Sequence, residues 1–266
     1  VQRRETDKRL EEFLEHPEGG FRIKAMMMLQ GFVLRRADVV TTPSAYLSEM
    51  LIKVYRVDPR RAVVNYNAAE ETEILPFETK RVRHQIATTA RLVAWKGVEG
   101  IVRATQILKQ KYPDVRFMIA GEGPEMEKLK SLTKEMNLEN EVEFLGKVSR
   151  AETWRLRQNS EVYVLNSTYE GLPHTVLTSF AAEIPTIATN ISGTNEAVYH
   201  EETGLLVEPG DSEALARAIE RIFEDSALAK QLVLGGSKLL KEKFSWQAHL
   251  NKLEGIFDSV LLKPRN

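Results

Sequence analysis

The sequence predicts an α/β protein whose main domain has a parallel sheet with helices on both faces. Short apolar runs alternate with stretches of helical periodicity over residues 86–207, and this alternation is typical of repeated strand–helix units. Glycines and charged residues directly follow several of the apolar runs. Because ligands of such sheets bind beyond the carboxyl ends of the strands, those loops are the first place to look for a site.

Shorter and less regular elements precede this domain. Residues 1–20 are highly charged and predict an exposed helix followed by a loop. Two helices and two short strands come next, predicted at residues 21–37 and 44–55 and at residues 38–42 and 61–65. Three consecutive methionines, residues 26–28, are interpreted as core filling. The acidic stretch 70–78 has no periodicity and is predicted to be a linker.

The regular part of the chain predicts six strands, at residues 86–90, 115–121, 142–145, 161–165, 185–189 and 204–207. Helices are predicted between them at residues 98–112 and 125–136, and a third begins at Ser149 with the Glu152 of a capping box. A fourth is expected to have Pro173 as its first helical residue, since the missing N–H is no loss there. The last predicted helix covers residues 246–262.

Composition excludes several classes of protein. The chain has 266 residues, a formal net charge of -1 and a pI near 6.6, so no global field favours nucleic acid or an anionic membrane. It contains no cysteine, which excludes disulfides and thiol catalysis. The five histidines lack metal-binding spacing, so no metal site is predicted. Without a transmembrane run of about 18 apolar residues or a signal peptide, the protein is predicted to be cytoplasmic.

Four loops contain residues suited to an anionic ligand. Arg91 and Lys96 follow the first strand and together could clamp a diphosphate, although two solvated surface cations are the alternative. Gly121 and Gly123 form a tight turn that a flat ligand could approach, but the third glycine of a dinucleotide fingerprint is absent. Glu170 and Gly171 precede a helix whose amino end could face an anion. Residues 190–196 form a second small-residue loop that is also expected to open a helix.

Several motifs together resemble the carboxyl-terminal domain of the retaining GT-B glycosyltransferases of family 4, also called glycosyl transferases group 1. In chain order they are ARLVAWKG, GEGPEMEKL, FLGKVSRAE, NSTYEGLPHTVLTSFAAEIPTIAT, NISGTNEAV and TGLLVEPGD. The earlier ADVVTTPSAYL and AVVNYNAAE resemble the last strands of the amino-terminal domain of that fold. The resemblance therefore implies a GT-B type, Rossmann-like fold in three parts. These are the end of the amino-terminal domain with the linker (1–79), the donor-binding domain (80–245) and a terminal helix that crosses back (246–266).

The resemblance also implies roles for individual residues. Arg91 and Lys96 would hold the diphosphate of a nucleotide sugar and stabilise charge on the departing nucleotide, without a metal or other cofactor. Glu170 would bind hydroxyls of the donor sugar. Further donor-binding positions are Gly121, Gly123, Lys147 and Val148 beside the nucleotide, and Gly171 and Leu172 at the phosphates. His174 is either close enough to touch a phosphate or sugar, or a helix-start residue that faces solvent.

Two features depart from the family pattern. The family commonly has a second Glu eight residues after the first, where it bonds the nucleotide ribose, and this chain has Thr178 there. Thr offers one hydroxyl and no bidentate carboxylate. Glu183, at a position where glycine is usual, is interpreted as ending the helix and not as replacing the lost acid. The second departure is length, because fewer than 85 residues precede the main sheet, whereas a complete amino-terminal domain is expected to have roughly 150 to 180.

These observations predict a retaining transfer of a hexose from a nucleotide-diphosphate sugar to an acceptor hydroxyl. The expected partners are the nucleotide sugar and a carbohydrate or lipid-linked acceptor, with peripheral membrane contact through a missing part left open. A non-catalytic protein that binds a nucleotide sugar or acts as a scaffold is the alternative, motivated by Thr178. A nucleotide-sugar epimerase with a GT-B fold fits the ARLVAWKG and YEGLP loops less well.

Overall fold

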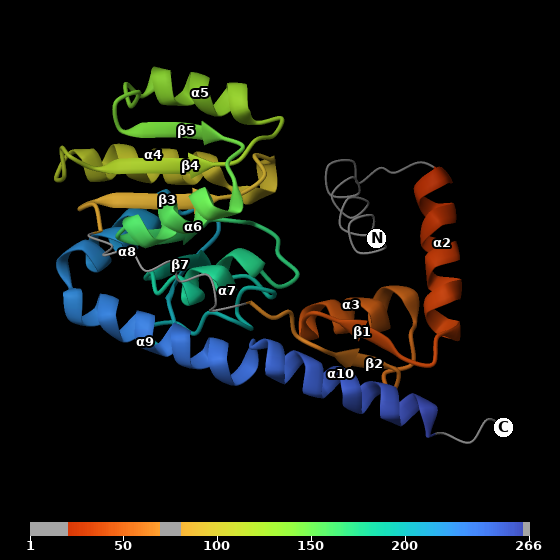
Figure 1. The fold of residues 1–266 in the computed structure, drawn as a ribbon. Coiled ribbons are helices and arrows are strands. Elements are labelled where there is room, and N and C mark those ends of the chain that lie inside the picture. Colours follow the sequence, from red (N-terminus) through yellow and green to blue (C-terminus); the bar gives the residue numbers. More distant parts are fainter. Residues whose placement is uncertain (1–20, 70–80, 263–266) are drawn as a thin grey trace. The chain divides into compact units, whose positions relative to one another are not determined.

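The computed structural model describes residues 21–69 and 81–262 (Figure 1). The helix predicted in residues 1–20 and the linker predicted at 70–78 lie outside the described residues. By its contacts the described chain divides at residues 64/65 and again at 255/256. Each of the two resulting units has its own parallel sheet, and the larger one contains all the residues proposed for a site.

Six parallel strands form the sheet of the larger unit in the order β5-β4-β3-β6-β7-β8. The strands are β3 (Gln85–Thr89), β4 (Arg116–Ala120), β5 (Val142–Gly146), β6 (Val162–Leu165), β7 (Thr186–Thr189) and β8 (Leu205–Val207). All six were predicted, and their ends agree within two residues. From β3 the chain builds the sheet outward to β5, and it then returns to β6 on the other side of β3. In such sheets this reversal opens a crevice at the carboxyl ends of the two central strands.

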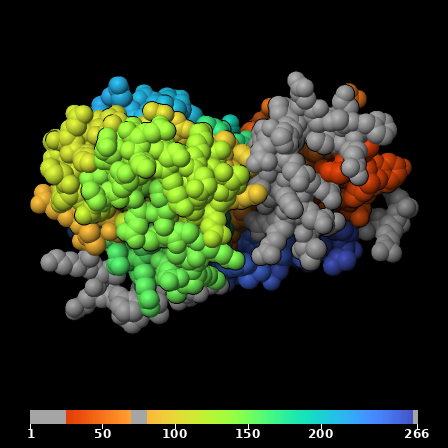
Figure 2. All heavy atoms as spheres, turned by 90° about the horizontal axis from the view of Figure 1, so that it is seen from above, coloured from red at the N-terminus to blue at the C-terminus, as the bar shows by residue number. Residues whose placement is uncertain are grey.

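Helices cover both faces of the sheet, as predicted. One buried core contains residues of α4 (Val98–Lys109), α5 (Met126–Glu135) and α8 (Ser212–Glu224), and the other contains residues of α6 (Arg150–Asn159) and α7 (His174–Ala181). Figure 2 shows the outer surface over α5 and β5, coloured yellow-green and green.

The two buried cores pack against opposite faces of the sheet and hold it rigid. The loops at the edge of the sheet therefore have fixed starting points.

α8 and α9 (Ser226–Lys243) fill a stretch for which the sequence analysis proposed no element. The signals were present: Asp211 and Asp225 each accept a bond from a backbone N–H in the first turn of the following helix, as N-caps do. On α8, Leu215, Ile219 and Ile222 are buried at helical spacing. α9 contacts both α7 and α8.

Three local expectations were wrong. Pro173 is the N-cap of α7 and not its first helical residue. Residues 191–198 form successive turns, in which Asn195 N–H bonds Ile191 O and Val198 N–H bonds Thr194 O, so the small-residue loop opens no helix. Met28 is 75 % exposed on α2 (Phe21–Arg36) and fills no core within the described residues.

The smaller unit contains a two-stranded parallel sheet, β1 (Val40–Thr42) and β2 (Ala62–Val64), together with α2 and α3 (Ala45–Tyr55). Ser44 caps α3 through a bond from Leu47 N–H of 3.1 Å, and each of these elements was predicted. The last helix, α10 (Trp246–Leu261), also matches its prediction. Among the described helices none has the length and apolar character needed to cross a membrane.

The residue that ends α7 is held in a strained backbone conformation. Glu183 has φ 54°, in the left-handed region, and its N–H bonds Phe180 O at 3.0 Å. Only glycine adopts this region without steric cost. Because α7 runs from the carboxyl edge of the sheet toward its amino edge, Glu183 is separated from Glu170 by the whole helix. Its position supports the interpretation that it ends the helix and does not replace the missing acid.

We predict that Glu183→Gly raises the free energy of unfolding by about 1 kcal/mol, because it removes the cost of the left-handed conformation. Denaturant unfolding followed by circular dichroism measures the change. Glu183→Ala is the matched control, since it removes the same carboxylate but keeps a Cβ. Equal stability of the two variants would contradict the backbone explanation.

Candidate functional site

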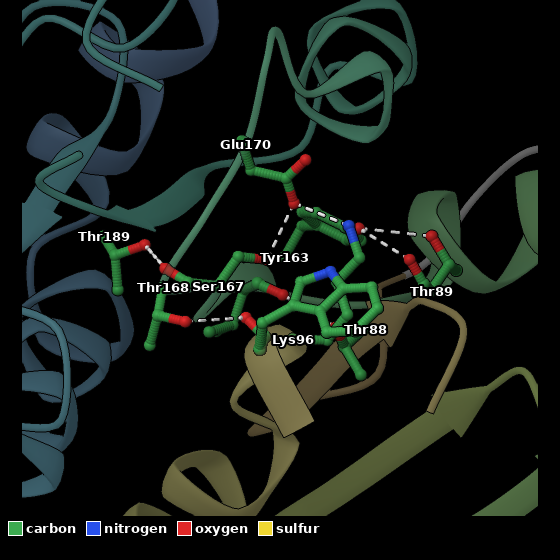
Figure 3. A network of polar contacts seen from close by, with 10 residues as sticks. Thr88, Thr89, Lys96, Tyr163, Ser167, Thr168, Glu170 and Thr189 are labelled. Atoms are coloured by element: carbon green, nitrogen blue, oxygen red, sulfur yellow. Dashed lines mark hydrogen bonds and ion pairs between the residues drawn. The ribbon is translucent and has the colours of Figure 1, made fainter. Parts of the chain in front are cut away.

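The loops that follow β3 and β6 meet where the strand order reverses, and they bring a cation and a carboxylate together. Lys96 ends the short helix η1 (Ala94–Lys96), and its Nζ lies 2.7 Å from Oε1 of Glu170. The side chains are 21 % and 11 % exposed, respectively. Figure 3 shows the pair and the polar side chains around it. Two of the three residues proposed for catalysis are therefore in direct contact.

Ser167 also hydrogen-bonds the Glu170 carboxylate. Its Oγ donates to Oε1 of Glu170 at 2.7 Å, and its side chain is fully buried. The hydroxyl of Thr189, at the end of β7, donates to the carbonyl of Ser167 (Figure 3). The position of Glu170 is thereby fixed from two neighbouring strands in addition to β3.

Backbone contacts fasten the two loops to each other. Thr168 N–H bonds Trp95 O at 2.7 Å, and the side-chain amide of Asn166 bonds Gly97 O at 2.8 Å. Gly97 has φ 61°, and a Cβ there would lie 2.0 Å from Asn166 O. Glycine is thus needed at this position for both its conformation and its size. Trp95 contributes a backbone acceptor to this contact.

A buried arginine lies under the loop after β3. Arg157 of α6 is 6 % exposed, its Nη2 donates to the hydroxyl of Thr89, and its guanidinium carbon lies 5.2 Å from the centre of the Tyr163 ring. The Tyr163 hydroxyl is 3.2 Å from the same Thr89 hydroxyl. Arg157 Nη1 donates to Thr153 O at 3.3 Å, and within the described part of the chain its buried Nε has no hydrogen-bond partner. The positive charge of the Arg157 guanidinium therefore lies close to the start of this loop.

The glycines after β4 serve the packing of loops. A Cβ on Gly121 would lie 1.8 Å from Ala90 O, and one on Gly123 would lie 2.2 Å from Leu92 O. The loop after β3 thus packs closely against both glycines, and their place beside a nucleotide stays a prediction. Gly121 N–H also bonds Gly146 O at 2.8 Å, which brings the loop after β5 alongside. In that loop Lys147 is exposed and Val148 packs against the second core.

The remaining proposed residues occupy the same edge in different ways. Arg91 is exposed in the loop after β3. Leu172 is buried, and Gly171 O faces Gly193 of the loop after β7. His174 is the first residue of α7 and is exposed, as its solvent-facing alternative predicted, and its Nε2 lies 3.2 Å from Ala68 O. Thr178 donates its hydroxyl to Thr175 O at 3.0 Å and so bonds its own helix.

The chain was also compared with known proteins. The sequence pattern of the family described as glycosyl transferases group 1 matches residues 71–238. The chain belongs to this family. It is 34 % identical over 173 residues to the lipopolysaccharide core biosynthesis glycosyltransferase LpsD of Rhizobium meliloti, covering 65 % of this chain and 49 % of that protein. A glycogen synthase of Mycobacterium tuberculosis is 26 % identical over 222 residues, covering 82 % of this chain and 53 % of that protein.

Solved structures share the fold. A glycosyltransferase of Rickettsia africae superposes with a TM-score of 0.77 at 22 % identity, covering 90 % of this chain and 68 % of that one. HepE of Anabaena, solved with UDP and glucose, gives 0.77 at 19 % identity, with coverages of 88 % and 66 %. This group 1 glycosyltransferase chain therefore has a GT-B type α/β fold. It spans about half of the length of the curated relatives it matches.

Some site residues were missed from the sequence. Ser167 stands three residues before Glu170, a spacing at which a side chain can reach back within one turn, but hydroxyls are too common in loops for this spacing to single it out. Thr189 and Arg157 act on residues far away in the chain, and no local pattern indicates them. Across residues 21–69 and 81–262 there is no group of three His, Asp or Glu side chains arranged to hold a metal ion.

Gly193 tests how closely the loops pack at this edge. A Cβ at Gly193 would lie 2.0 Å from Glu170 O, so the Glu170 loop must move. We predict that Gly193→Ala lowers the free energy of unfolding by about 1–3 kcal/mol, the range for overpacking. In Gly255→Ala the new Cβ meets nothing within 4 Å on α10, and a gain of up to about 1 kcal/mol is expected from helix propensity. If thermal or denaturant unfolding shows no loss of stability in Gly193→Ala, the close contact between Gly193 and the Glu170 carbonyl is wrong.

Proposed function

We propose that this chain contains the donor-binding domain of a glycosyltransferase that moves a hexose from a nucleotide-diphosphate sugar to an acceptor hydroxyl with retention of configuration. The observation that carries the proposal is the contact between Lys96 and Glu170 at the point where the strand order reverses. One residue of this pair suits a phosphate and the other suits sugar hydroxyls. They belong to loops that start from adjacent strands.

The chemistry needs stabilisation of the leaving group. When the bond between the sugar C1 and the diphosphate oxygen breaks, the bonding electrons remain on the nucleoside diphosphate. Arg91 and Lys96 would stabilise that charge electrostatically, and the retained charge of Arg157 would add to the potential. Glu170 would accept hydrogen bonds from hydroxyls of the hexose and hold its C1 toward the acceptor. In this proposal the cationic side chains, and not a metal ion, stabilise the leaving group.

Relatives make the donor class reasonable. HepE was solved with UDP and glucose, and LpsD and glycogen synthase are named for the building of saccharides. By analogy the acceptor is a carbohydrate or a lipid-linked carbohydrate. The three-part division at residues 79/80 and 245/246, the family 4 assignment and the cytoplasmic location stay predictions.

We predict micromolar binding of one nucleoside diphosphate among UDP, GDP and ADP, measured by calorimetric titration. Lys96→Ala and Arg91→Ala should each weaken it by about 1.5–3 kcal/mol, the value of a hydrogen bond to a charged group. Lys134→Ala, an exposed lysine in the last turn of α5, is the control for a general loss of positive charge. The donor site is refuted if none of the three diphosphates binds the unmodified chain.

A non-catalytic nucleotide-sugar-binding or scaffolding protein is the second candidate, and Thr178 is the observation that favours it. The hydroxyl of Thr178 bonds Thr175 O within α7, so it is already occupied at the position where relatives would offer a carboxylate to the ribose. If the protein is an enzyme, it transfers the sugar or slowly hydrolyses the nucleotide sugar. If it is a binding protein, it binds the donor but does not release the sugar from it.

We predict that Thr178→Glu tightens binding of the nucleoside diphosphate about tenfold, because it restores charged acceptors for two ribose hydroxyls. Titration of the same diphosphate into Thr178→Gln separates the effect of charge from that of size, and a smaller gain is expected there. Unchanged affinity in Thr178→Glu would mean that the ribose does not lie beside α7, and the donor pose would have to be revised.

A further inference from the structure

We propose that, when the donor binds, the Lys96 ammonium breaks its ion pair with Glu170 and pairs with the diphosphate instead. Ser167 is then the positioning residue that keeps the Glu170 carboxylate in place. This inference rests on the proposed function. It adds a residue, Ser167, that neither the sequence motifs nor the comparisons single out.

Two donors share one oxygen of the Glu170 carboxylate. Lys96 Nζ and Ser167 Oγ each lie 2.7 Å from Oε1 of Glu170. Among the residues that the structure describes, none hydrogen-bonds Oε2, and the side chain is 11 % exposed. A carboxylate has acceptor capacity on both oxygens. Oε2 is therefore the oxygen that a sugar hydroxyl would meet, and Oε1 is the one that the protein uses to fix the group.

The charges of Lys96 and Glu170 offset each other while the two side chains are paired. While Lys96 pairs with Glu170, its positive charge is largely cancelled for any other anion. A diphosphate carries more negative charge than one carboxylate, and an ammonium is a compact charge on a flexible stem with three rotatable donors. Lys96 can thus turn toward phosphate oxygens. Glu170 then loses its cation next to a second anion, and repulsion would drive the carboxylate away unless another group retained it.

Ser167 is built to retain it. The hydroxyl is neutral, so its bond to Oε1 does not depend on the charge that Lys96 takes away. Its backbone is fixed by β6 on one side and by the bond from the Thr189 hydroxyl to its carbonyl on the other. Full burial leaves the Ser167 hydroxyl little freedom to choose another partner. Serine is short, and its reach to Glu170 is set by the three-residue turn between them.

The exchange makes an unusual prediction for Glu170→Gln. Removing the carboxylate frees Lys96, so the diphosphate should bind more tightly although a residue of the site has been changed. We expect about a five- to tenfold lower Kd for inorganic pyrophosphate and for the nucleoside diphosphate that the unmodified chain binds. The reason is that Lys96 no longer has to break its ion pair with residue 170 before it contacts the phosphates. The additional affinity that a nucleotide sugar gains over its diphosphate should be lost in the same variant. Both are measured by calorimetric titration.

Ser167→Ala should have the complementary effect. The Lys96 site is untouched, so Kd for pyrophosphate and for the nucleoside diphosphate should stay within about twofold. Affinity for the nucleotide sugar should fall about tenfold, because a displaced Glu170 carboxylate no longer meets the sugar hydroxyls. Ser226→Ala, an exposed serine at the start of α9, controls for loss of a hydroxyl.

The outcomes separate this inference from the proposed function. If the unmodified chain binds none of the diphosphates or pyrophosphate, both fall. If it binds one of them but Glu170→Gln binds it no better, the partner exchange is wrong while the donor site stands. If Ser167→Ala weakens diphosphate and nucleotide sugar equally, Ser167 supports the fold of the loop and does not position Glu170. Circular dichroism and thermal unfolding of each variant show whether its fold is retained.

Discussion

The ion pair between Lys96 and Glu170 joins two loops that are 74 residues apart in the chain. It forms because β3 and β6 are neighbours, and they are neighbours because the chain turns back to the centre of the sheet after β5. Everything proposed for the site depends on that reversal. A sheet that grew steadily in one direction would carry Lys96 and Glu170 to opposite sides of two intervening strands, and neither could influence the ligand of the other.

Adjacent strands are not sufficient, because the loops must also approach within hydrogen-bond distance. Glycines allow this approach. Gly97 lies against the backbone of Asn166, Gly121 against Ala90, and Gly193 against Glu170. At each contact a Cβ would overlap a carbonyl oxygen. The result is a layer of backbone at the carboxyl edge of the sheet in which the position of one loop determines that of the next. Such a layer fixes the backbone positions from which the Lys96 and Glu170 side chains extend.

The sequence was sufficient for the strands, for most helices and for the proposal of Lys96 and Glu170, because hydrophobic periodicity and short motifs are local properties. It was not sufficient for contacts between loops. The bond of Ser167 to Glu170 spans three residues, yet only the folded loop shows that both Ser167 and Lys96 use the same oxygen. Arg157 reaches Thr89 across the space between a helix and a strand. The turns after Ile191 replaced a predicted helix because they bring Gly193 against Glu170 and Gly171, a demand of tertiary packing.

Thr178 lies within α7 and Glu183 lies two residues after its end, and the two positions differ in what they demand of the fold. Glu183 accepts a left-handed backbone at the far end of α7, where its cost falls on stability and its side chain is remote from the donor loops. Thr178 lies one turn into the same helix, with its hydroxyl already satisfied by Thr175 O. Threonine there leaves no side-chain hydroxyl unpaired, so the fold does not depend on a carboxylate at this position. The Lys96, Glu170 and Ser167 arrangement does not include Thr178. In the proposed donor site, contacts to the diphosphate and sugar would therefore be independent of residue 178, and a threonine there would affect only contacts to the nucleoside.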